Sequence, residues 1–137
     1  MAWKPSQPEF ERLFTLEEAT ALLPTLRPRL QELAVKKRRL DEVQREFAVL
    51  RRHVPANGHG KRAQELEREL RALLDAINSE VAAIRALGIE VKDLDIGLVD
   101  FPSEREGRVV FLCWRMDEPA IVAWHEIDAG YRGRQPL

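Results

Sequence analysis

Apolar residues recur at helical spacing through the first two thirds of the chain. Two stripes with spacings of three, four or seven residues run over residues 26–50 and 63–87, separated by a Pro-, Asn- and Gly-containing stretch. Their members are Leu26, Leu30, Leu33, Leu40, Val43, Phe47 and Leu50, then Ala63, Leu66, Leu70, Leu73, Ile77, Val81, Ile84 and Leu87. We therefore predict a coiled-coil-like antiparallel helical hairpin over residues 25–88, with Gly88 as the C-terminal cap of its second helix.

A short helix is predicted ahead of the hairpin, over residues 15–23. Thr15 and Glu18 have the spacing of a capping box. Pro24 disfavours helical geometry in the residue before it and has no backbone N–H, so this helix is expected to stop there. A new helix would begin at Thr25, and residues 1–12 are expected to form a loose N-terminus.

After Gly88 the pattern changes to one of β-branched and aromatic residues. It predicts three strands, over residues 96–101, 109–116 and 120–126, joined by turn-like connectors over residues 102–107 and 117–119. Short connectors favour an antiparallel meander, which a polar C-terminal tail follows within residues 89–137. The whole chain is thus an α+β protein with a single domain over residues 1–137.

The three-residue connector before Ala120 predicts a register in which Phe111 faces His125 and Cys113 faces Ala123. It divides the strand residues between two faces. One face would carry Val99, Phe101, Phe111, Cys113, Ile121, Ala123 and His125, and the other Ile96, Leu98, Asp100, Val110, Leu112, Trp114, Met116, Val122, Trp124 and Glu126. Both faces are largely apolar, and one hairpin covers only one of them. The N-terminal helix, the C-terminal tail or a second copy must cover the other, and for this reason we expect a homodimer.

Length and composition limit the class of protein. The 137 residues are 45% hydrophobic and 33% charged, which fits one domain with a modest core. Cys113 is the single cysteine, so no intrachain disulfide can form. The first 25 residues lack the apolar core of a signal peptide, and the longest apolar run, Val109 to Trp114, is far shorter than the ~20 residues of a membrane span. We expect a cytoplasmic protein without a membrane partner.

Charge is unevenly distributed although the net charge is only −1. Residues 24–70 hold 12 basic and 7 acidic side chains, whereas residues 88–137 hold 6 and 10. The basic side chains at the tip of the hairpin are Arg51, Arg52, Lys61 and Arg62. Such a tip could bind nucleic-acid phosphates. The alternating Glu and Arg residues of the second arm suit salt bridges between the two helices equally well.

Polar residues near the ends of the strands suggest a catalytic hypothesis. His125 could act as a general acid or base, with Asp100 or Glu126 as the carboxylate that fixes its tautomer. The alternative is a partly buried histidine whose hydrogen bonds are satisfied by backbone or by an acid. Cys113 would lie diagonal to His125, but a cysteine within Val-Phe-Leu-Cys-Trp is more typical of a small core residue than of a nucleophile.

The C-terminal tail suggests a ligand-binding hypothesis. Arg132 and Arg134 could clamp an anion in a pocket beside Trp124, together with Asp128. The alternative is that these arginines form structural salt bridges. No metal site is predicted, because His125, Glu126 and Asp128 lack helical ligand spacing and a single cysteine cannot supply a structural zinc site. The sequence names no cofactor.

Several segments carry a resemblance to a known family. They are residues 13–19, 22–24, 88–95, 97–102, 112–114 and 124–135. In these segments the chain resembles the bacterial family catalogued as domain of unknown function 2203, and the resemblance implies no activity, cofactor or catalytic residue. Since no complete catalytic constellation can be assembled, the leading hypothesis is a non-enzymatic, homodimeric interaction or scaffold protein whose hairpin binds a partner protein. A small enzyme or an anion- or metal-ligand-binding module using His125, Arg132 and Arg134 is the alternative, and nucleic-acid binding at the hairpin tip is a second one.

Overall fold

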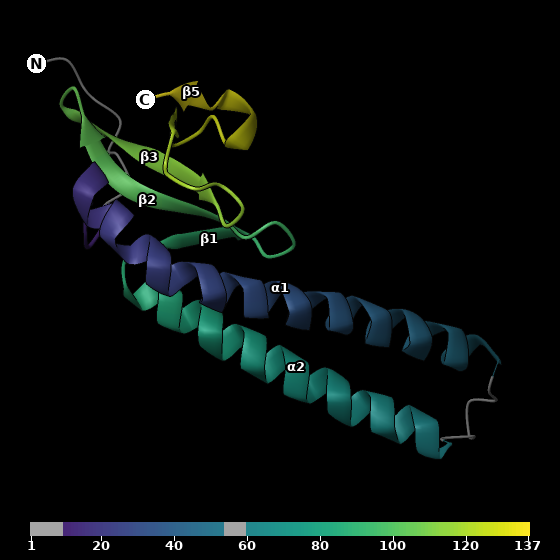
Figure 1. The fold of residues 1–137 in the computed structure, drawn as a ribbon. Helices are drawn as coiled ribbons and strands as arrows, with labels where there is room; N and C mark the ends of the chain where they lie inside the picture. Colours follow the sequence, from purple (N-terminus) through teal and green to yellow (C-terminus); the bar gives the residue numbers. More distant parts are fainter. Residues whose placement is uncertain (1–9, 54–59) are drawn as a thin grey trace, which may run out of the picture.

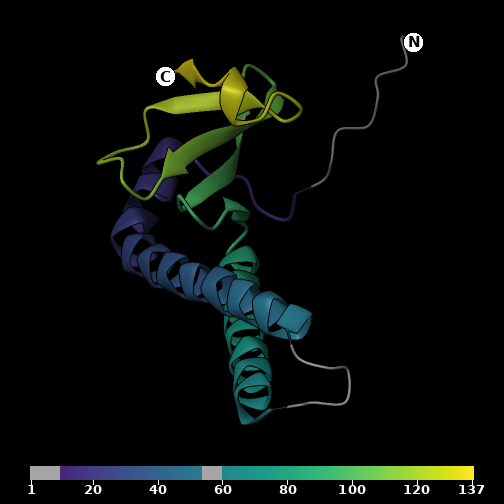
Figure 2. The same cartoon turned by 90° about the vertical axis from the view of Figure 1, so that its right-hand side faces the viewer.

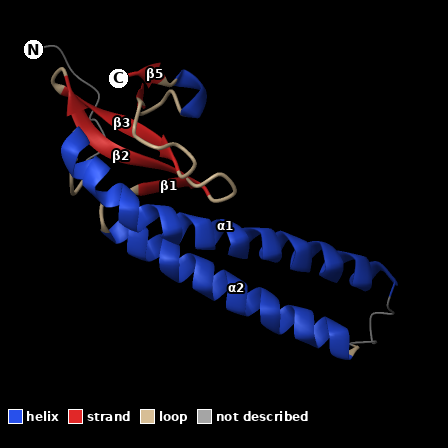
Figure 3. Ribbon diagram, viewed as in Figure 1, coloured by secondary structure: helices blue, strands red, loops and turns tan. Residues whose placement is uncertain are grey.

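Two long helices precede a single antiparallel sheet (Figure 1 and Figure 3). The computed structural model describes residues 10–53 and 60–137. Its elements are α1 (Leu16–His53), α2 (Lys61–Ala86), β1 (Glu90–Asp93), β2 (Leu98–Arg105), β3 (Arg108–Arg115), β4 (Ala123–Glu126), the short 3₁₀ turn η1 (Tyr131–Gly133) and β5 (Gln135–Pro136). The strands lie in the order β1-β2-β3-β4-β5, so the predicted α+β class is confirmed.

The start of α1 follows the predicted capping box. The Thr15 N–H donates to Glu18 Oε1 at 3.0 Å, and the Glu18 N–H donates to Thr15 Oγ1 at 3.1 Å. Most of the predicted loose N-terminus, residues 1–9, lies outside the described residues. Phe14, just before the cap, is buried in the core, and its N–H donates to the carbonyl oxygen of Pro102 in β2 at 2.7 Å. The first turn of α1 is therefore fixed directly to the sheet.

The predicted helix end at Pro24 is wrong, because α1 continues through both Pro24 and Pro28. A proline inside a helix costs about 3 kcal/mol. Buried residues on both sides of Pro24, among them Leu23 and Leu26, belong to one core, and full burial of a leucine contributes roughly 1.5 to 3 kcal/mol. Packing thus outweighs the local preference, and Figure 2 shows the purple N-terminal part of α1 running in a different direction from the rest.

α1 and α2 pack side by side as a hairpin that extends away from the sheet (Figure 1). The predicted salt bridges between the helices are present: Arg39 bonds Glu69 with Nε–Oε1 and Nη2–Oε2 distances of 2.6 and 2.9 Å. α2 ends at Ala86 with Leu87 as its C-cap, one residue before the predicted cap Gly88. Gly88 adopts a φ of +94°, and its N–H donates to the Arg85 carbonyl oxygen at 2.9 Å.

The sheet has five strands rather than the predicted three. The predicted connector over residues 102–107 is mostly strand, because β2 pairs with β3 as far as Arg105 opposite Arg108. Only Glu106 and Gly107 form the turn, with φ values of +52° and +77°. The four-residue β1 and the two-residue β5 add the outer strands, and both are too short to give a periodic sequence signal.

The observed register confirms two predicted pairs, Phe111 with His125 and Cys113 with Ala123. It also corrects the predicted faces of β2. Asp100 lies opposite Cys113, so Asp100 shares the face of Cys113 and His125, while Val99 and Phe101 point to the other face with Leu112 and Trp114.

Each face of the sheet is covered by segments of the same chain. The face that carries Val99 and Trp114 packs against the helices in the main hydrophobic core. On the other face the ring of Phe10 packs edge-on against Phe111 at 5.5 Å, and Lys92 lies over that ring. Figure 1 shows the C-terminal segment with η1 and β5 on the side of the sheet away from α1. A second copy is therefore not needed to cover a face, and the homodimer stays a prediction.

None of the helices in residues 10–53 and 60–137 is long and apolar enough to cross a membrane.

Candidate metal centre

Three side chains of the metal-binding types converge on the face of the sheet away from the helices. Asp100 comes from β2, Cys113 from β3 and His125 from β4. One ligand atom of each lies within 4.8 Å of the others, and the three residues are 2%, 0% and 2% exposed. Neighbouring strands thus hold a carboxylate, a thiol and an imidazole together in a site closed to solvent.

Strand alternation places these three residues on one face. Asp100 and Cys113 are directly opposite in the β2–β3 pair, and His125 faces Phe111, two positions before Cys113. The neighbours of Asp100 in the chain, Val99 and Phe101, are both fully buried in the core on the other face. A slip of one residue would expose that core and bury charge in its place, so the register of Asp100 is strongly specified.

The hydrogen bonds of His125 fix the direction of its ring. Nδ1 lies 2.7 Å from the carbonyl oxygen of Glu126, which can only accept, so Nδ1 carries a hydrogen and donates it. Nε2 lies 3.1 Å from both carboxylate oxygens of Asp100. One proton must therefore lie between Nε2 and the carboxylate. A histidine that donates from one ring nitrogen to a carbonyl and presents the other to a carboxylate is oriented like a metal ligand.

Burial determines the protonation of the other two groups. It raises the pKa of the Asp100 carboxyl, and the positive charge on His125 opposes that shift. Burial also raises the pKa of the Cys113 thiol to about 12, with a further increase from the nearby Asp100 charge. Cys113 is thus a neutral thiol at physiological pH, which does not suit an unassisted nucleophile.

The three groups can supply a donor set for a divalent cation. With one thiolate, one carboxylate and one neutral imidazole, the bound ion would leave the site with no net charge, which favours burial. Among residues 10–53 and 60–137, the set leaves a fourth tetrahedral position without a protein ligand.

Glu126, the other predicted carboxylate partner of His125, lies elsewhere. It is next to His125 in β4 and therefore points to the opposite face, where Oε1 accepts from Nε of Arg108 at 2.9 Å. The same ion pair holds the pKa of Glu126 below its usual range. The structure brings Asp100 and His125 together and leaves Glu126 apart.

The residues predicted to bind an anion do not form one site either. Arg134 pairs with Glu118, with Nη2 2.9 Å from Oε2, while Arg132 is exposed in η1 and Asp128 is exposed in the preceding turn. The charge of Arg134 acts to lower the pKa of Cys113, against the larger effect of burial. Its Nε is buried without a hydrogen-bond partner among the residues that the structure describes.

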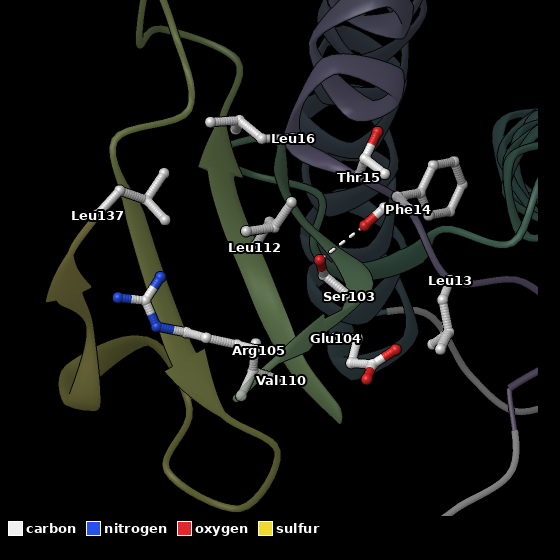
Figure 4. A pocket seen from close by; sticks show the side chains of 10 residues that line it. All are labelled: Leu13, Phe14, Thr15, Leu16, Ser103, Glu104, Arg105, Val110, Leu112 and Leu137. Atoms are coloured by element: carbon white, nitrogen blue, oxygen red, sulfur yellow. Dashed lines mark hydrogen bonds between the residues drawn. The ribbon is translucent and has the colours of Figure 1, made fainter. Parts of the chain in front are cut away.

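The pocket expected beside Trp124 is on the other side of the sheet from His125. A cavity of about 490 Å³ lies between the start of α1, the adjoining ends of β2 and β3, and Leu137 (Figure 4). Arg105, which lines it, stacks on the ring of Trp124 with its guanidinium carbon 4.6 Å from the ring centroid. We call this the Arg105 cavity. Trp124 and His125 therefore do not share one site.

The basic residues of the hairpin tip lie where the two helices end. Arg51 and Arg52 close α1, and Lys61 and Arg62 open α2, with residues 54–59 between them outside the described residues. Arg62 is already paired with Glu46 at 2.8 Å, and it also contacts Glu65 at 3.4 Å. Carboxylates thus neutralise part of this positive cluster.

Sequence reasoning missed the grouping of Asp100 with Cys113 because it placed Asp100 on the wrong face. The dipeptide Glu106-Gly107 was the available signal, since glycine accepts the positive φ that a two-residue hairpin turn requires. With that turn, strand pairing counts back directly from Arg108 to Asp100 opposite Cys113.

Comparison with known proteins gives a family and no activity. No curated protein and no solved structure matches the chain. Residues 12–137 match a family model, which covers all but the first residues of the chain and agrees with the resemblance seen in the sequence. The chain therefore belongs to the family described as Uncharacterized conserved protein (DUF2203).

Proposed function

We propose that this protein binds one divalent transition-metal ion of the zinc class through Asp100, Cys113 and His125. The observation that carries this proposal is the convergence of their ligand atoms to within 4.8 Å of one another in a buried site. With metal–ligand distances of about 2.0 to 2.3 Å, the ligands of a tetrahedral zinc ion lie roughly 3.3 to 3.8 Å apart. The 3.1 Å between His125 Nε2 and the Asp100 oxygens is close to that spacing, so small side-chain movements would open the site to an ion.

The donor types select the class of metal. A thiolate with an imidazole suits zinc and its neighbours among the transition metals, whereas calcium and magnesium prefer sites made entirely of oxygen donors. The proposal fits a reducing compartment such as the cytoplasm, in which the lone Cys113 stays a thiol.

Burial favours a structural role for the ion over a catalytic one. The side chains of Asp100 and His125 are 3% and 2% exposed, so a substrate has no direct path to the centre. An ion held by residues of β2, β3 and β4 would cross-link three strands and stabilise the folded state by mass action. The function we propose is thus that of a non-enzymatic metal-binding protein.

Cobalt(II) is the probe that tests the proposal. Added to the full chain, it should give a one-to-one complex with the near-ultraviolet absorption of cobalt–thiolate bonding and the visible bands of tetrahedral cobalt, and zinc should displace it. Cys113→Ala should abolish the thiolate absorption, and His125→Gln should weaken binding strongly. His53→Gln, at the exposed end of α1, is the matched control and should bind like the wild type.

Circular dichroism must show that each variant is folded. The proposal fails if the wild type gives no thiolate absorption with cobalt, or if folded Cys113→Ala and His125→Gln bind as tightly as the control.

A second candidate function is self-association through the hairpin. We propose it because the hairpin extends beyond the sheet (Figure 1) and carries Val35, Val49 and Leu74 at 56%, 52% and 37% exposure. Light scattering should then give twice the chain mass of 15.8 kDa. The double variant Val35→Glu with Val49→Glu should return to the single-chain mass, and a wild type at that mass would contradict this candidate.

A further inference from the structure

The Arg105 cavity is built separately from the metal centre. It lies on the helix-facing side of the sheet, next to the β2–β3 turn, and its volume of about 490 Å³ is within the usual range of small-molecule sites. Val110 and Leu112 of β3 contribute its buried apolar wall, as Figure 4 shows. The cavity therefore borders the main hydrophobic core, which contains both residues, and is separate from the metal centre.

Large apolar side chains stay exposed around this cavity. Leu13, Leu16 and Leu137 all line it and are 41%, 38% and 45% exposed. They come from the segment before α1, from its first turn and from the residue after β5, so three separate parts of the chain place leucines around one hollow. Exposed leucines grouped around a concave surface indicate a binding site more than single surface leucines do.

Most polar groups of the lining are already occupied. The Ser103 hydroxyl donates to the Phe14 carbonyl oxygen at 2.6 Å, and the Thr15 hydroxyl accepts the Glu18 N–H of the capping box. Glu104 also lines the cavity, but strand alternation directs its side chain to the other face of β2 from Arg105. The cationic group that this leaves for a ligand is the guanidinium of Arg105.

Arg105 is held in place without being neutralised. Its guanidinium stacks on Trp124, and within residues 10–53 and 60–137 it has no carboxylate within ion-pair distance. Arg108 makes a useful contrast, because it lies over the same ring and pairs with Glu126 and Glu106. The contact with Trp124 holds the Arg105 guanidinium in place and leaves its N–H donors available to an anion.

We propose that the Arg105 cavity binds a small amphipathic carboxylate. Its apolar chain lies against Leu16, Leu112 and Leu137, and its carboxylate accepts hydrogen bonds from Arg105. Apolar burial supplies affinity, and the single guanidinium selects an acid over a neutral molecule of the same shape.

Octanoate and 1-octanol form a matched pair of probes, because they share a chain length and differ in charge. Amide resonances of the full ¹⁵N-labelled chain should shift saturably with octanoate at Leu13, Ser103 and Leu112. Octanol should bind the same place more weakly. Arg105→Met, which keeps an apolar stem, should lower octanoate affinity by roughly tenfold and leave octanol unchanged.

Arg71→Met, at an arginine of α2 whose side chain is 77% exposed, is the control and should leave both affinities unchanged. A second variant, Leu16→Ser, should weaken both probes, because Leu16 contacts only the apolar chain. The proposal is overturned if octanoate causes no saturable shifts around the cavity, or if Arg105→Met binds octanoate as the wild type does. Neither result depends on a metal at Asp100, Cys113 and His125.

Discussion

Raising the pH should strengthen metal binding steeply, because the side chains of Asp100, Cys113 and His125 share two protons that a bound ion must displace. One is the thiol proton of Cys113, whose pKa burial raises to about 12. The other lies between His125 Nε2 and the Asp100 carboxylate, as the Nδ1–H bond to the Glu126 carbonyl oxygen requires. A metal ion needs a thiolate, a carboxylate and a free Nε2 lone pair, so binding must release both protons.

The size of the effect follows from that count. Each released proton raises apparent affinity about tenfold per pH unit, or about 1.4 kcal/mol, so two protons give about a hundredfold, or about 2.8 kcal/mol. The metal-bound form holds fewer protons, so affinity rises as pH rises and falls as pH falls. The charges of Lys92, Arg134 and Glu118 also act on Asp100 or Cys113.

Zinc affinity can be measured against a competing chelator between about pH 6.5 and pH 7.5. The slope of the logarithm of affinity against pH then gives the number of protons released. Calorimetry in buffers of different ionisation enthalpy counts the same protons independently. Cys113→Ser removes the thiol proton from the count, so its slope should fall to one. A wild-type slope of one or less would refute the shared proton between His125 and Asp100.

Three further predictions concern stability and reactivity. Native Cys113 should resist a thiol-specific disulfide reagent at pH 8 and react fully in denaturant. In the folded protein the thiol is 0% exposed, and with a pKa of about 12 only about one thiol in ten thousand is ionised at pH 8. Equal reaction rates in the folded and denatured states would contradict this prediction. Thr15→Ala should lower the free energy of unfolding by about 1 kcal/mol in a urea titration, through loss of the cap to Glu18, whereas no change would show that the cap contributes nothing. Gly88→Ala should cost about 1 to 2 kcal/mol in the same titration, because φ is +94° and the new Cβ would lie 3.1 Å from Arg12 Cβ; an unchanged midpoint would exclude that strain.

Local signals in the sequence predicted local features of the fold well. The capping box at Thr15, the glycine at position 88 that follows α2 and the pairing of Phe111 with His125 each depend on residues close in the chain or on one short turn. The break at Pro24 failed because distant packing of Leu23 and Leu26 decides that point of α1. Intrinsic helix propensity is a weak predictor of where a helix ends, because tertiary contacts can override it.

Only part of the candidate metal site could be predicted from the sequence. His125 and Asp100 were both predicted to be functional residues. The predicted alternation of side chains along β2, however, put Asp100 on the face of Leu112 and Trp114 instead of the face of Cys113. An error in one turn length moves every side chain of a strand to the other face, and this one hid the metal-ligand set. The partners of Arg134 and Glu126 depend on contacts across the sheet that no local pattern encodes.

The shortness of the two outer strands has a consequence for the behaviour of the protein at high concentration. A long, flat strand at the border of a sheet offers a row of unpaired backbone groups to another molecule, and such borders are where aggregation begins. Here β1 has four residues with an irregular register, and β5 has two. The Phe14 N–H occupies the Pro102 carbonyl oxygen beyond the end of β1. The eight-residue strands β2 and β3 are thereby kept in the interior of the sheet, which shortens the run of unpaired backbone that a neighbouring chain could pair with.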